Sequence, residues 1–339
     1  MLGVLADLHL KDNLSYSEYV KDGRLKEKQD ILDFIANSLA DCNKIVIAGD
    51  CFNTKNNTSA TIKQFVDFLE KFDGKDVYII SGNHDRLANG TTAIDFLKQI
   101  KGKKWHIITD KLTIIDNITF LPYFFKCELG VETDEDGTKK LMEQLTNGNI
   151  LVTHYAISDT MSKVSTNLFH EIVLPQEELK KKFNLIISGH IHQQTIEDRI
   201  LVPGSIFNQE IGDTEKFIYN IDDNLNVQPI KLPGREIIQL KNPEEKDWIN
   251  LPVDSIIKVI LTEKMSKIKI ADLKEKLKNK FNEQGAYIMV EQIANERERL
   301  HYGDGESVLE MTIPQLLEIY SKTKKVDLKK LLKGFELIN

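Results

Sequence analysis

Short apolar runs rich in β-branched residues recur along the first two thirds of the chain and predict buried strands. These runs lie at residues 2–6, 44–48, 77–80, 149–153 and 185–188, and each stops at a polar cluster. Between them, residues 25–39 and 62–72 place apolar side chains on one face of a helix. Strands that alternate with helices in this way indicate a layered α/β fold.

Three further runs, at residues 105–108, 112–116 and 118–122, follow one another with only tight turns between them. Consecutive strands of this kind indicate that the sheet is mixed or doubled. We expect residues 199–203, 217–222 and 227–232 to continue the second sheet. The predicted architecture is α/β, with two layered, mixed β-sheets flanked by helices.

A polar, turn-prone stretch around Pro233-Gly234 and residues 242–245 predicts a domain boundary, so that the main domain spans residues 1–232. A smaller α/β unit at 233–300 is expected to hold a strand at 256–261, a Lys/Glu-rich helix at 270–281 and a strand at 287–293. Residues 301–339 show weakly amphipathic helical patterns, which fit a solvated helical pair and a partner-binding segment equally.

The charge balance gives no support to a general nucleic-acid surface. The 339 residues include 45 Lys and Arg against 52 Asp and Glu, which gives a formal charge of -7. The residues from Arg235 onward are close to neutral, so the negative charge belongs mainly to the preceding part, where bound cations would offset some of it. Net charge therefore does not exclude DNA as a substrate.

The chain shows no sign of a membrane or export segment. It has no run of about 18 apolar residues, and Asp7 follows the first residues too soon for a signal peptide or membrane anchor. We therefore expect a cytoplasmic location.

Cys42, Cys51 and Cys127 are odd in number and lack CxxC spacing. This pattern argues against both a disulfide framework and a thiolate zinc site. We expect all three to be reduced and mostly packing residues. For Cys51 we favour a small buried side chain over a nucleophile.

Metal-binding side chains cluster just after the predicted strands. Asp7 and His9 follow the first strand, Asp50 the second, Asn83, His84 and Asp85 the third, His154 the fourth, and His190 with His192 the fifth. In open α/β sheets the carboxyl ends of the strands form the edge where ligands bind, so loops far apart in sequence meet there. The i and i+2 spacing of Asp7 with His9, and of His190 with His192, directs each pair to one side of an extended backbone.

Imidazoles, carboxylates and one amide, without thiolates, favour manganese, iron or zinc over calcium. Two such ions about 3.5 to 4 Å apart can share a bridging carboxylate and clamp a phosphate, and Asp50 is the natural bridge. Each motif alone has an ordinary explanation as a turn or a chance pair, but five motifs in order after five strands make coincidence a poor explanation. His106, His170 and His301 have no such context and are expected to be ordinary histidines.

The sequence lacks the motifs of several other enzyme classes. It contains no Gly-x-Ser-x-Gly elbow and no Gly-x-x-x-x-Gly-Lys-Ser/Thr loop, and His170-Glu171 is followed by Ile-Val-Leu instead of completing His-Glu-x-x-His. The chain cannot itself be a P-loop ATPase.

Together, Asp7-Leu8-His9, Gly49-Asp50-Cys51-Phe52, Gly82-Asn83-His84-Asp85, Thr153-His154 and Gly189-His190-Ile191-His192 resemble the five signatures of the calcineurin-like metallophosphoesterases. This resemblance covers residues 1 to about 232. Within the superfamily the chain looks most similar to the Mre11/SbcD nucleases, including viral and phage members, on Phe52, Pro203-Gly204-Ser205 and Glu215-Lys216-Phe217. It implies the metallophosphoesterase fold with a small capping domain and C-terminal helices.

The resemblance also implies a role for each side chain. One ion would be held by Asp7, His9, Asp50 and His192, and a second by Asp50, Asn83, His154 and His190. His84 would be the general acid or phosphate stabiliser, with Asp85 in a supporting role. The implied cofactors are two divalent metal ions, with manganese preferred.

The implied activity is that of a DNA exonuclease or endonuclease in DNA repair, recombination or replication. The implied partners are single- or double-stranded DNA ends, a Rad50/SbcC-type ATPase bound by the C-terminal helices, and a second copy of the chain. The small domain would be a cap contacting the DNA backbone. Asn53 stands where this subfamily often has Asp or His, and Tyr155 is atypical, so a titrating role at position 53 is lost and exonuclease activity is expected to be altered.

Two other functions fit the same residues. A small-molecule phosphodiesterase or a protein phosphatase of the same superfamily would turn over cyclic nucleotides or phosphoserine, but not linear duplex DNA. A weakly active scaffold would recruit a partner through its C-terminal helices, and the intact ligand set argues against it.

Overall fold

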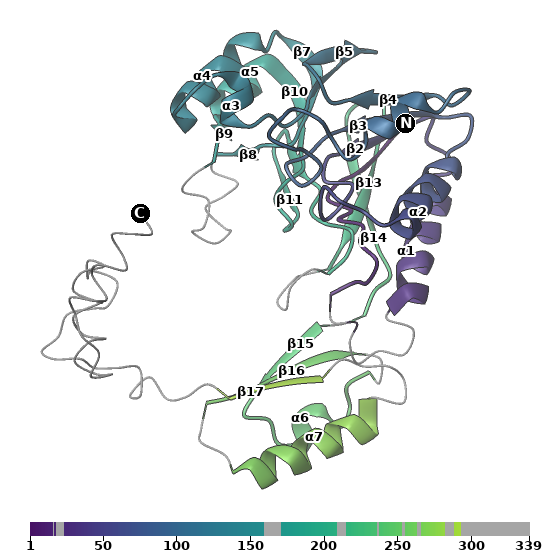
Figure 1. The fold of residues 1–339 in the computed structure, drawn as a ribbon, viewed down its shortest axis with the longest axis vertical. Helices are drawn as coiled ribbons and strands as arrows, with labels where there is room; N and C mark the ends of the chain where they lie inside the picture. The colour runs from purple at the N-terminus through teal and green to yellow at the C-terminus, as the bar shows by residue number, and fades with distance from the viewer. Residues whose placement is uncertain are drawn as a thin grey trace, which may run out of the picture.

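The computed structural model describes residues 1–15, 17, 24–158, 171–208, 215–235, 237–252, 255–262, 266–281 and 288–292 of the 339-residue chain. Two six-stranded sheets form its centre, and a three-stranded sheet lies apart from them (Figure 1). Within these residues, no helix combines the length and the apolar character needed to span a membrane.

The first sheet has the order β14-β13-β1-β2-β3-β4. Its strands are β1 (Leu2–Leu5), β2 (Lys44–Ala48), β3 (Asp76–Ile80), β4 (Trp105–Ile108), β13 (Phe217–Ile221) and β14 (Val227–Lys231). Strands β1 to β4 run parallel, whereas β13 is antiparallel to both β1 and β14. The carboxyl ends of β1, β2 and β3 therefore meet at one edge of this sheet.

The second sheet has the order β11-β12-β10-β7-β6-β5. Its strands are β5 (Thr113–Ile115), β6 (Ile118–Leu121), β7 (Gly148–Thr153), β10 (Phe183–Ser188), β11 (Thr195–Glu197) and β12 (Ile200–Val202). Strands β6, β7, β10 and β12 are parallel, and an antiparallel strand closes each end. The short strands β8 (Ala156–Ile157) and β9 (Val173–Leu174) pair separately.

Alternation of side chains along the strands separates three apolar layers. Val4, Val46 and Val152 pack between the two sheets, while Leu5, Ile45 and Ile47 face the helices α1 (Leu25–Ser38) and α2 (Ser59–Glu70). The outer face of the second sheet is covered by α3 (Lys126–Leu129), α4 (Asp134–Gln144) and α5 (Gln176–Lys182). A short 3-10 helix, η2 (Asp95–Gln99), precedes β4. The order is helix, sheet, sheet, helix, and every central strand is buried.

The fold class predicted from the sequence is confirmed, since the two sheets are mixed and flanked by helices. The assignment of residues 217–222 and 227–232 to the second sheet is wrong, because β13 and β14 extend the first sheet. A strand pattern indicates burial but not the partner strand. The edge of β1 that β2 leaves open is fully buried, and β13 supplies its hydrogen-bonding partners.

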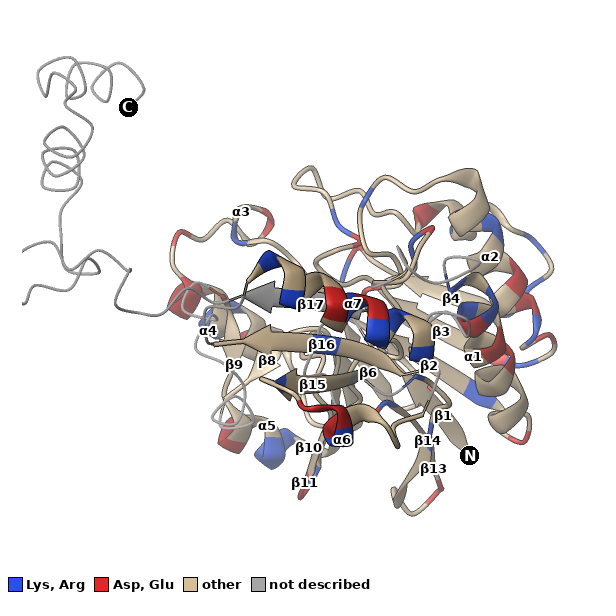
Figure 2. Ribbon diagram, turned by 90° about the horizontal axis from the view of Figure 1, so that it is seen from below, with Lys and Arg blue, Asp and Glu red and all other residues tan. Residues whose placement is uncertain are grey.

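The three-stranded sheet has its own small core. Its parallel strands are β15 (Ile237–Lys241), β16 (Ile256–Leu261) and β17 (Ile288–Gln292), with α6 (Glu245–Trp248) and α7 (Lys267–Phe281) beside them. Trp248, Val259, Leu277 and Phe281 are buried together. Strand β15 was not anticipated from the sequence. Figure 2 shows that α7 carries both basic and acidic side chains. The domain limits at 232 and 300 remain predictions, and residues 301–339 lie outside the described residues.

The cysteine prediction holds for two of three residues. Cys42 and Cys51 are buried, but Cys127 is exposed, so it is not a packing residue. Burial, followed by the negative charge of Asp85, raises the pKa of the Cys51 thiol well above its ordinary value. A protonated, buried thiol is a poor nucleophile, which agrees with a packing role for Cys51.

A buried arginine ties the loop after β3 to α3. Arg86 is 3% exposed and forms an ion pair with Glu128 at 2.7 Å, and it also donates a 2.6 Å hydrogen bond to the Thr109 carbonyl. We expect Arg86→Met to lower the free energy of unfolding by about 3 kcal/mol, because the mostly buried Glu128 carboxylate would lose its only ion-pair partner among the described residues. Urea denaturation measures this loss.

Lys63→Met is the matched control for Arg86→Met, because it removes an ion pair to Asp67 in which both side chains are exposed. Such pairs contribute little to stability. Equal destabilisation by the two substitutions would contradict a structural role for the buried pair.

Candidate metal centre

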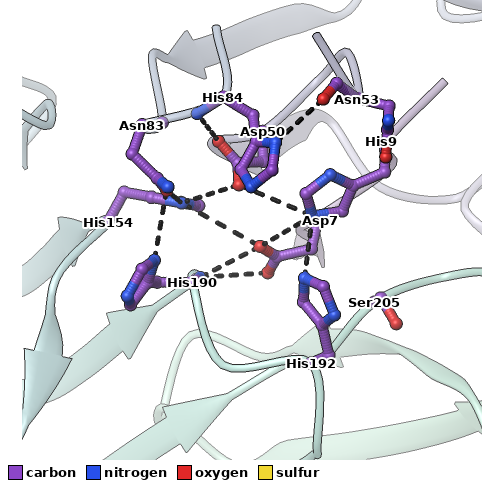
Figure 3. Close-up of polar contacts among 12 residues, drawn as sticks. Asp7, His9, Asp50, Asn53, Asn83, His84, His154, His190, His192 and Ser205 are labelled. Atoms are coloured by element: carbon purple, nitrogen blue, oxygen red, sulfur yellow. Dashed lines mark hydrogen bonds and ion pairs between the residues drawn. The ribbon is translucent and has the colours of Figure 1, made fainter. Parts of the chain in front are cut away.

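The predicted metal ligands meet where the carboxyl ends of the two sheets face each other. Asp7 and His9 follow β1, Asp50 follows β2, and Asn83 follows β3, while His154, His190 and His192 follow β7 and β10. Figure 3 shows all seven side chains converging from these separate loops. The structure therefore brings together every residue that the sequence predicted to be a metal ligand.

The loops adopt a backbone conformation that is rare outside glycine. Asp7, His9, Asp50 and His190 have φ values of 50°, 43°, 49° and 87°. Backbone hydrogen bonds from Asp7 N to Gly49 O (3.1 Å) and from His9 N to Asp50 O (2.9 Å) hold the first two loops together. Strained non-glycine residues persist where the surroundings enforce them, and they concentrate at functional sites.

Two glycines leave room for the functional side chains. A Cβ atom on Gly49, whose φ is +91°, would lie 2.1 Å from Nδ1 of His154, and one on Gly82 would lie 2.0 Å from Oδ1 of Asp50. Neither contact is sterically possible. The glycines that precede the ligands are therefore required for the loops to pack this closely.

Asp50 lies between two groups of donor atoms. Its Oδ2 atom is 3.5 Å from Nε2 of His9 and 3.3 Å from Nε2 of His154. On one side, the Nε2 atoms of His9 and His192 are 2.8 Å apart. On the other side, Asn83 Oδ1 lies 3.2 Å from His154 Nε2 and 3.1 Å from His190 Nδ1. The two groups match the two ligand sets expected from the resemblance, with Asp50 shared.

Hydrogen bonds on the far side of two imidazoles orient them toward the centre. Nδ1 of His154 donates to the carbonyl oxygen of Ala48 at 2.7 Å, which turns Nε2 toward Asp50. Nε2 of His190 lies 2.6 Å from Oε2 of Glu171, which turns Nδ1 toward Asn83. Metal-ligating histidines are commonly fixed in this way by a carbonyl or a carboxylate.

The electrostatics of the site favour a bound cation. Burial raises the pKa of Asp7 to about 8. Burial also opposes charge on Asp50 and His154, but their attraction outweighs it, so the pKa of Asp50 lies below its ordinary value and that of His154 rises to about 10. Burial lowers the pKa of His9 to about 3. Without metal, the negative charge of the two buried carboxylates is thus neutralised by a proton on Asp7 and by a proton on His154 beside Asp50. Divalent cations bound by the same donor atoms would neutralise this charge instead.

One further observation shows that the donor set fits metal ions. Nε2 of His9 and Nε2 of His192 face each other, and Nδ1 of His9 is buried without a hydrogen-bonding partner among the described residues. Imidazole, carboxylate and amide donors in such a cluster suit borderline divalent ions. The residues present therefore fit two divalent metal ions.

His84 stands at the exposed edge of this centre. Its ring lies edge-on to that of His9, with 4.7 Å between centroids, and its backbone N–H donates to Asp50 Oδ1 at 2.9 Å. Its Nδ1 atom is 2.8 Å from the backbone carbonyl of Asn53. Asn53 thus contacts the site through its backbone carbonyl, and this contact does not depend on its side chain.

Asp85 supports the loops and lies outside the donor cluster. Its buried carboxylate accepts hydrogen bonds from the backbone N–H groups of Cys51 (3.1 Å), Phe52 (3.0 Å) and Gly82 (3.0 Å). These bonds hold the loops after β2 and β3 together. Tyr155 is similarly structural, because its hydroxyl group accepts from Phe124 N at 2.7 Å.

Sequence reasoning missed two supporting residues, Glu171 and Lys216. Buried Lys216 donates to Ser205 Oγ at 2.9 Å and to the His192 carbonyl at 3.3 Å. The Ser205 and Lys216 motifs had been noted only as marks of a subfamily, and no spacing signal linked Glu171 to His190. His106 pairs with Asp76 at 2.9 Å, away from the centre. His170 and His301 lie outside the described residues.

Removing the carboxylate that orients His190 tests the centre without touching a ligand. We expect Glu171→Gln to weaken metal affinity by about 10- to 100-fold, because Gln keeps the shape but accepts the imidazole proton less strongly. Calorimetric titration with Mn²⁺ measures the change. Glu177→Gln is the matched control, since Glu177 is exposed and its neighbour is Lys180. Unchanged affinity in Glu171→Gln would contradict the positioning role.

Known proteins resemble the chain as follows. The family model of calcineurin-like phosphoesterases matches residues 2–194. A Staphylococcus aureus structure described as a 5′-nucleotidase in complex with α-ketoglutarate is 13% identical, over 82% of this chain and 58% of that one, with a TM-score of 0.36. A cold-active protein-tyrosine phosphatase from a psychrophilic Shewanella species is 13% identical, over 68% of this chain and 80% of that one, with a TM-score of 0.31. The chain thus spans less than two thirds of the first structure's length.

Proposed function

The chain belongs to the calcineurin-like phosphoesterase family, and from this membership we propose that it hydrolyses phosphodiester bonds of DNA with two divalent metal ions. The observation that carries the proposal is the convergence of seven donor side chains, with Asp50 between the other six. Family membership makes the protein a metal-dependent hydrolase. The DNA substrate is the finer part of the proposal.

The residues divide the work of hydrolysis between them. Asp7, His9, Asp50 and His192 would hold one ion, and Asp50, Asn83, His154 and His190 the other. The chemistry that such ions supply when bound is neutralisation of phosphate charge and activation of water. Manganese is the proposed metal, because the resemblance to the Mre11/SbcD nucleases implies it. The nitrogen and oxygen donors of the site suit manganese, iron and zinc alike.

His84 would act on the phosphate oxygen or on the departing oxygen. Nδ1 of His84 donates to the Asn53 carbonyl, so the proton available for transfer belongs on Nε2. The ring is exposed and lies next to His9 of the donor cluster. A histidine placed in this way can donate a proton to a leaving alkoxide.

Incubation of the purified protein with labelled linear duplex, single-stranded DNA and Mn²⁺, with and without chelator, tests the substrate class. We expect metal-dependent cleavage of DNA. Turnover of cyclic nucleotides or phosphoserine without DNA cleavage would instead identify a small-molecule phosphodiesterase or a phosphatase. That second candidate is favoured by the open cavity beside His84, whose volume of about 830 Å³ is large enough for a nucleotide-sized molecule.

The proposed complex contains a Rad50/SbcC-type ATPase and a second copy of the chain. The proposed ATPase-binding segment, residues 301–339, lies outside the described residues. A dimer contact is proposed through the helical regions after Gly23 or Thr58, which correspond to α1 and α2. The remaining alternative is that the protein is a weakly active scaffold. In that case, cells carrying the His84→Ala protein should keep the wild-type phenotype although hydrolysis is lost.

DNA binding by the isolated chain is expected to be weak. Phosphate contacts dominate affinity for DNA, and the formal charge of the chain is -7. Affinity should therefore rise sharply when the ATPase is added, which fluorescence anisotropy at several salt concentrations measures. Nanomolar binding by the isolated chain at physiological salt would contradict this expectation.

A further inference from the structure

A cavity adjoins the metal centre and is not explained by it. The cavity has a volume of about 830 Å³, and its lining includes Asn83 and His84 together with Lys55, Tyr123 and Phe125. Two residues of the proposed active site thus line the same cavity as two aromatic rings and a lysine. Metal binding requires none of these three side chains.

The aromatic wall is fixed relative to His84. The backbone N–H of Phe125 donates to Oε2 of Glu128 at 3.0 Å, and Glu128 is ion-paired with buried Arg86. Arg86 follows His84 by two residues in the sequence. The chain of contacts therefore runs from the active-site loop to the aromatic wall through a buried ion pair.

Tyr123 packs against Phe125 and lines the same cavity. The two rings meet edge-on, with 5.3 Å between centroids, and Tyr123 stacks on Tyr155 at 5.0 Å. Phe125 is half-buried in spite of this support. Such a ring, held in place and open to a cavity, offers a flat apolar surface to a bound molecule.

Lys55 supplies a positive charge beside that surface. Its Nζ atom lies 5.4 Å from the centroid of the Phe125 ring, and its side chain is exposed. The cavity's other lysine, Lys126, is paired with Asp134 at 3.0 Å. A cation over an exposed ring is held weakly, so Lys55 can turn to an arriving anion and uncover the ring.

We propose that this cavity binds the nucleoside on the leaving-group side of the scissile phosphodiester, with its base stacked on Phe125 and the next phosphate paired with Lys55. The proposal rests on the proposed function. In its proposed role as general acid, His84 would meet the departing oxygen, so the group that carries this oxygen would lie in the cavity that His84 lines. A planar ring followed by an anion is the complement of Phe125 and Lys55, and base stacking on aromatic side chains is the usual means of holding single strands.

The test uses short oligonucleotides with one cleavable phosphodiester and non-hydrolysable linkages elsewhere. One version carries a base on each side of that bond, and two others replace one base by an abasic sugar. We expect the wild-type protein to lose kcat/KM when the base on the leaving-group side of the cleavable bond is removed. Removal of the base on the other side should leave kcat/KM unchanged. Phe125→Leu, which keeps an apolar side chain, should lower the kcat/KM ratio of base-containing to abasic substrate about tenfold, whereas Phe125→Tyr should retain the preference.

Equal loss of kcat/KM on base-containing and abasic substrates in Phe125→Leu would overturn the stacking role and leave phosphodiester hydrolysis standing. Absence of cleavage of every oligonucleotide by the wild-type protein would overturn the proposed function and this subsite together. Fluorescence of 2-aminopurine at the preferred position gives a readout independent of turnover. Quenching by the wild-type protein and by Phe125→Tyr, lost in Phe125→Leu, is the expected result.

Lys55 has a separate signature. Lys55→Gln should raise KM for all base sequences alike. It should also lower the slope of log KM against log salt concentration by about 1, as expected for the loss of one phosphate contact. Lys63→Gln is the matched control, because Lys63 is exposed but already paired with Asp67. The same salt dependence in Lys55→Gln and the wild-type protein would remove Lys55 from the subsite.

Discussion

His84→Ala is expected to lower kcat for phosphodiester hydrolysis by about 10²- to 10⁴-fold, the usual contribution of a positioned acid or base. The ring is exposed at the edge of the donor cluster, so its loss removes a proton donor without opening the core. The substitution keeps the backbone N–H that donates to Asp50. Metal binding should therefore persist, and calorimetric titration with Mn²⁺ alongside DNA cleavage rates separates the two effects.

His106→Ala is the matched control for His84→Ala. His106 is a partly exposed histidine on β4 that contacts Asp76 and Tyr78 away from the centre. The His106→Ala protein should hydrolyse DNA at the wild-type rate. A His84→Ala protein that retained kcat, or one that lost bound metal together with kcat, would remove His84 from the role of proton donor.

The residues predicted as donors lie together in the structure, and the sequence could predict this proximity because its signals are local. Each ligand directly follows a strand whose apolar run is readable, and parallel strands place their carboxyl ends along one edge. The positions of Asp7, Asp50 and His154 follow from these two facts. Strand limits such as Lys44–Ala48 agree with the predicted range.

The sequence patterns did not identify residues that act on a partner far away in the chain. Glu171 orients His190 across 19 residues, and Lys216 reaches the His192 carbonyl across 24. Neither separation carries a periodic or motif signal. The pairing of β13 with β1 likewise depends on which buried edge lacks hydrogen-bonding partners, and a pattern of apolar residues in one strand does not record this.

Asp50→Asn is expected to abolish both hydrolysis and stabilisation by metal, because Asp50 is the carboxylate shared by the two groups of donors. For the wild-type protein, Mn²⁺ at 100 times its dissociation constant should add about 2.7 kcal/mol per site to the free energy of unfolding. Thermal denaturation with and without Mn²⁺ measures the difference. Asp76→Asn, which changes a carboxylate beside His106, is the matched control and should respond to Mn²⁺ as the wild-type protein does.

The stabilisation by Mn²⁺ should also increase with pH. Without metal, the folded protein holds extra protons, because the pKa of Asp7 is raised from 3.8 to about 8 and that of His154 from 6.5 to about 10. Both groups bind protons more tightly than in the unfolded chain, so their contribution to stability falls as pH rises through these values. His9, whose pKa is lowered to about 3, is already neutral and has no proton to release near pH 7.

Metal ions must displace the protons of Asp7 and His154, so binding at pH 7 should release about two protons. Calorimetry in buffers of different ionisation enthalpy counts them. The rise in melting temperature on adding Mn²⁺ should accordingly be larger at pH 8 than at pH 6. A rise independent of pH, or one that Asp50→Asn shares with the wild-type protein, would mean that the stabilising ions bind elsewhere, because His154 and Asp50 are ion-paired and Asp7 lies beside them.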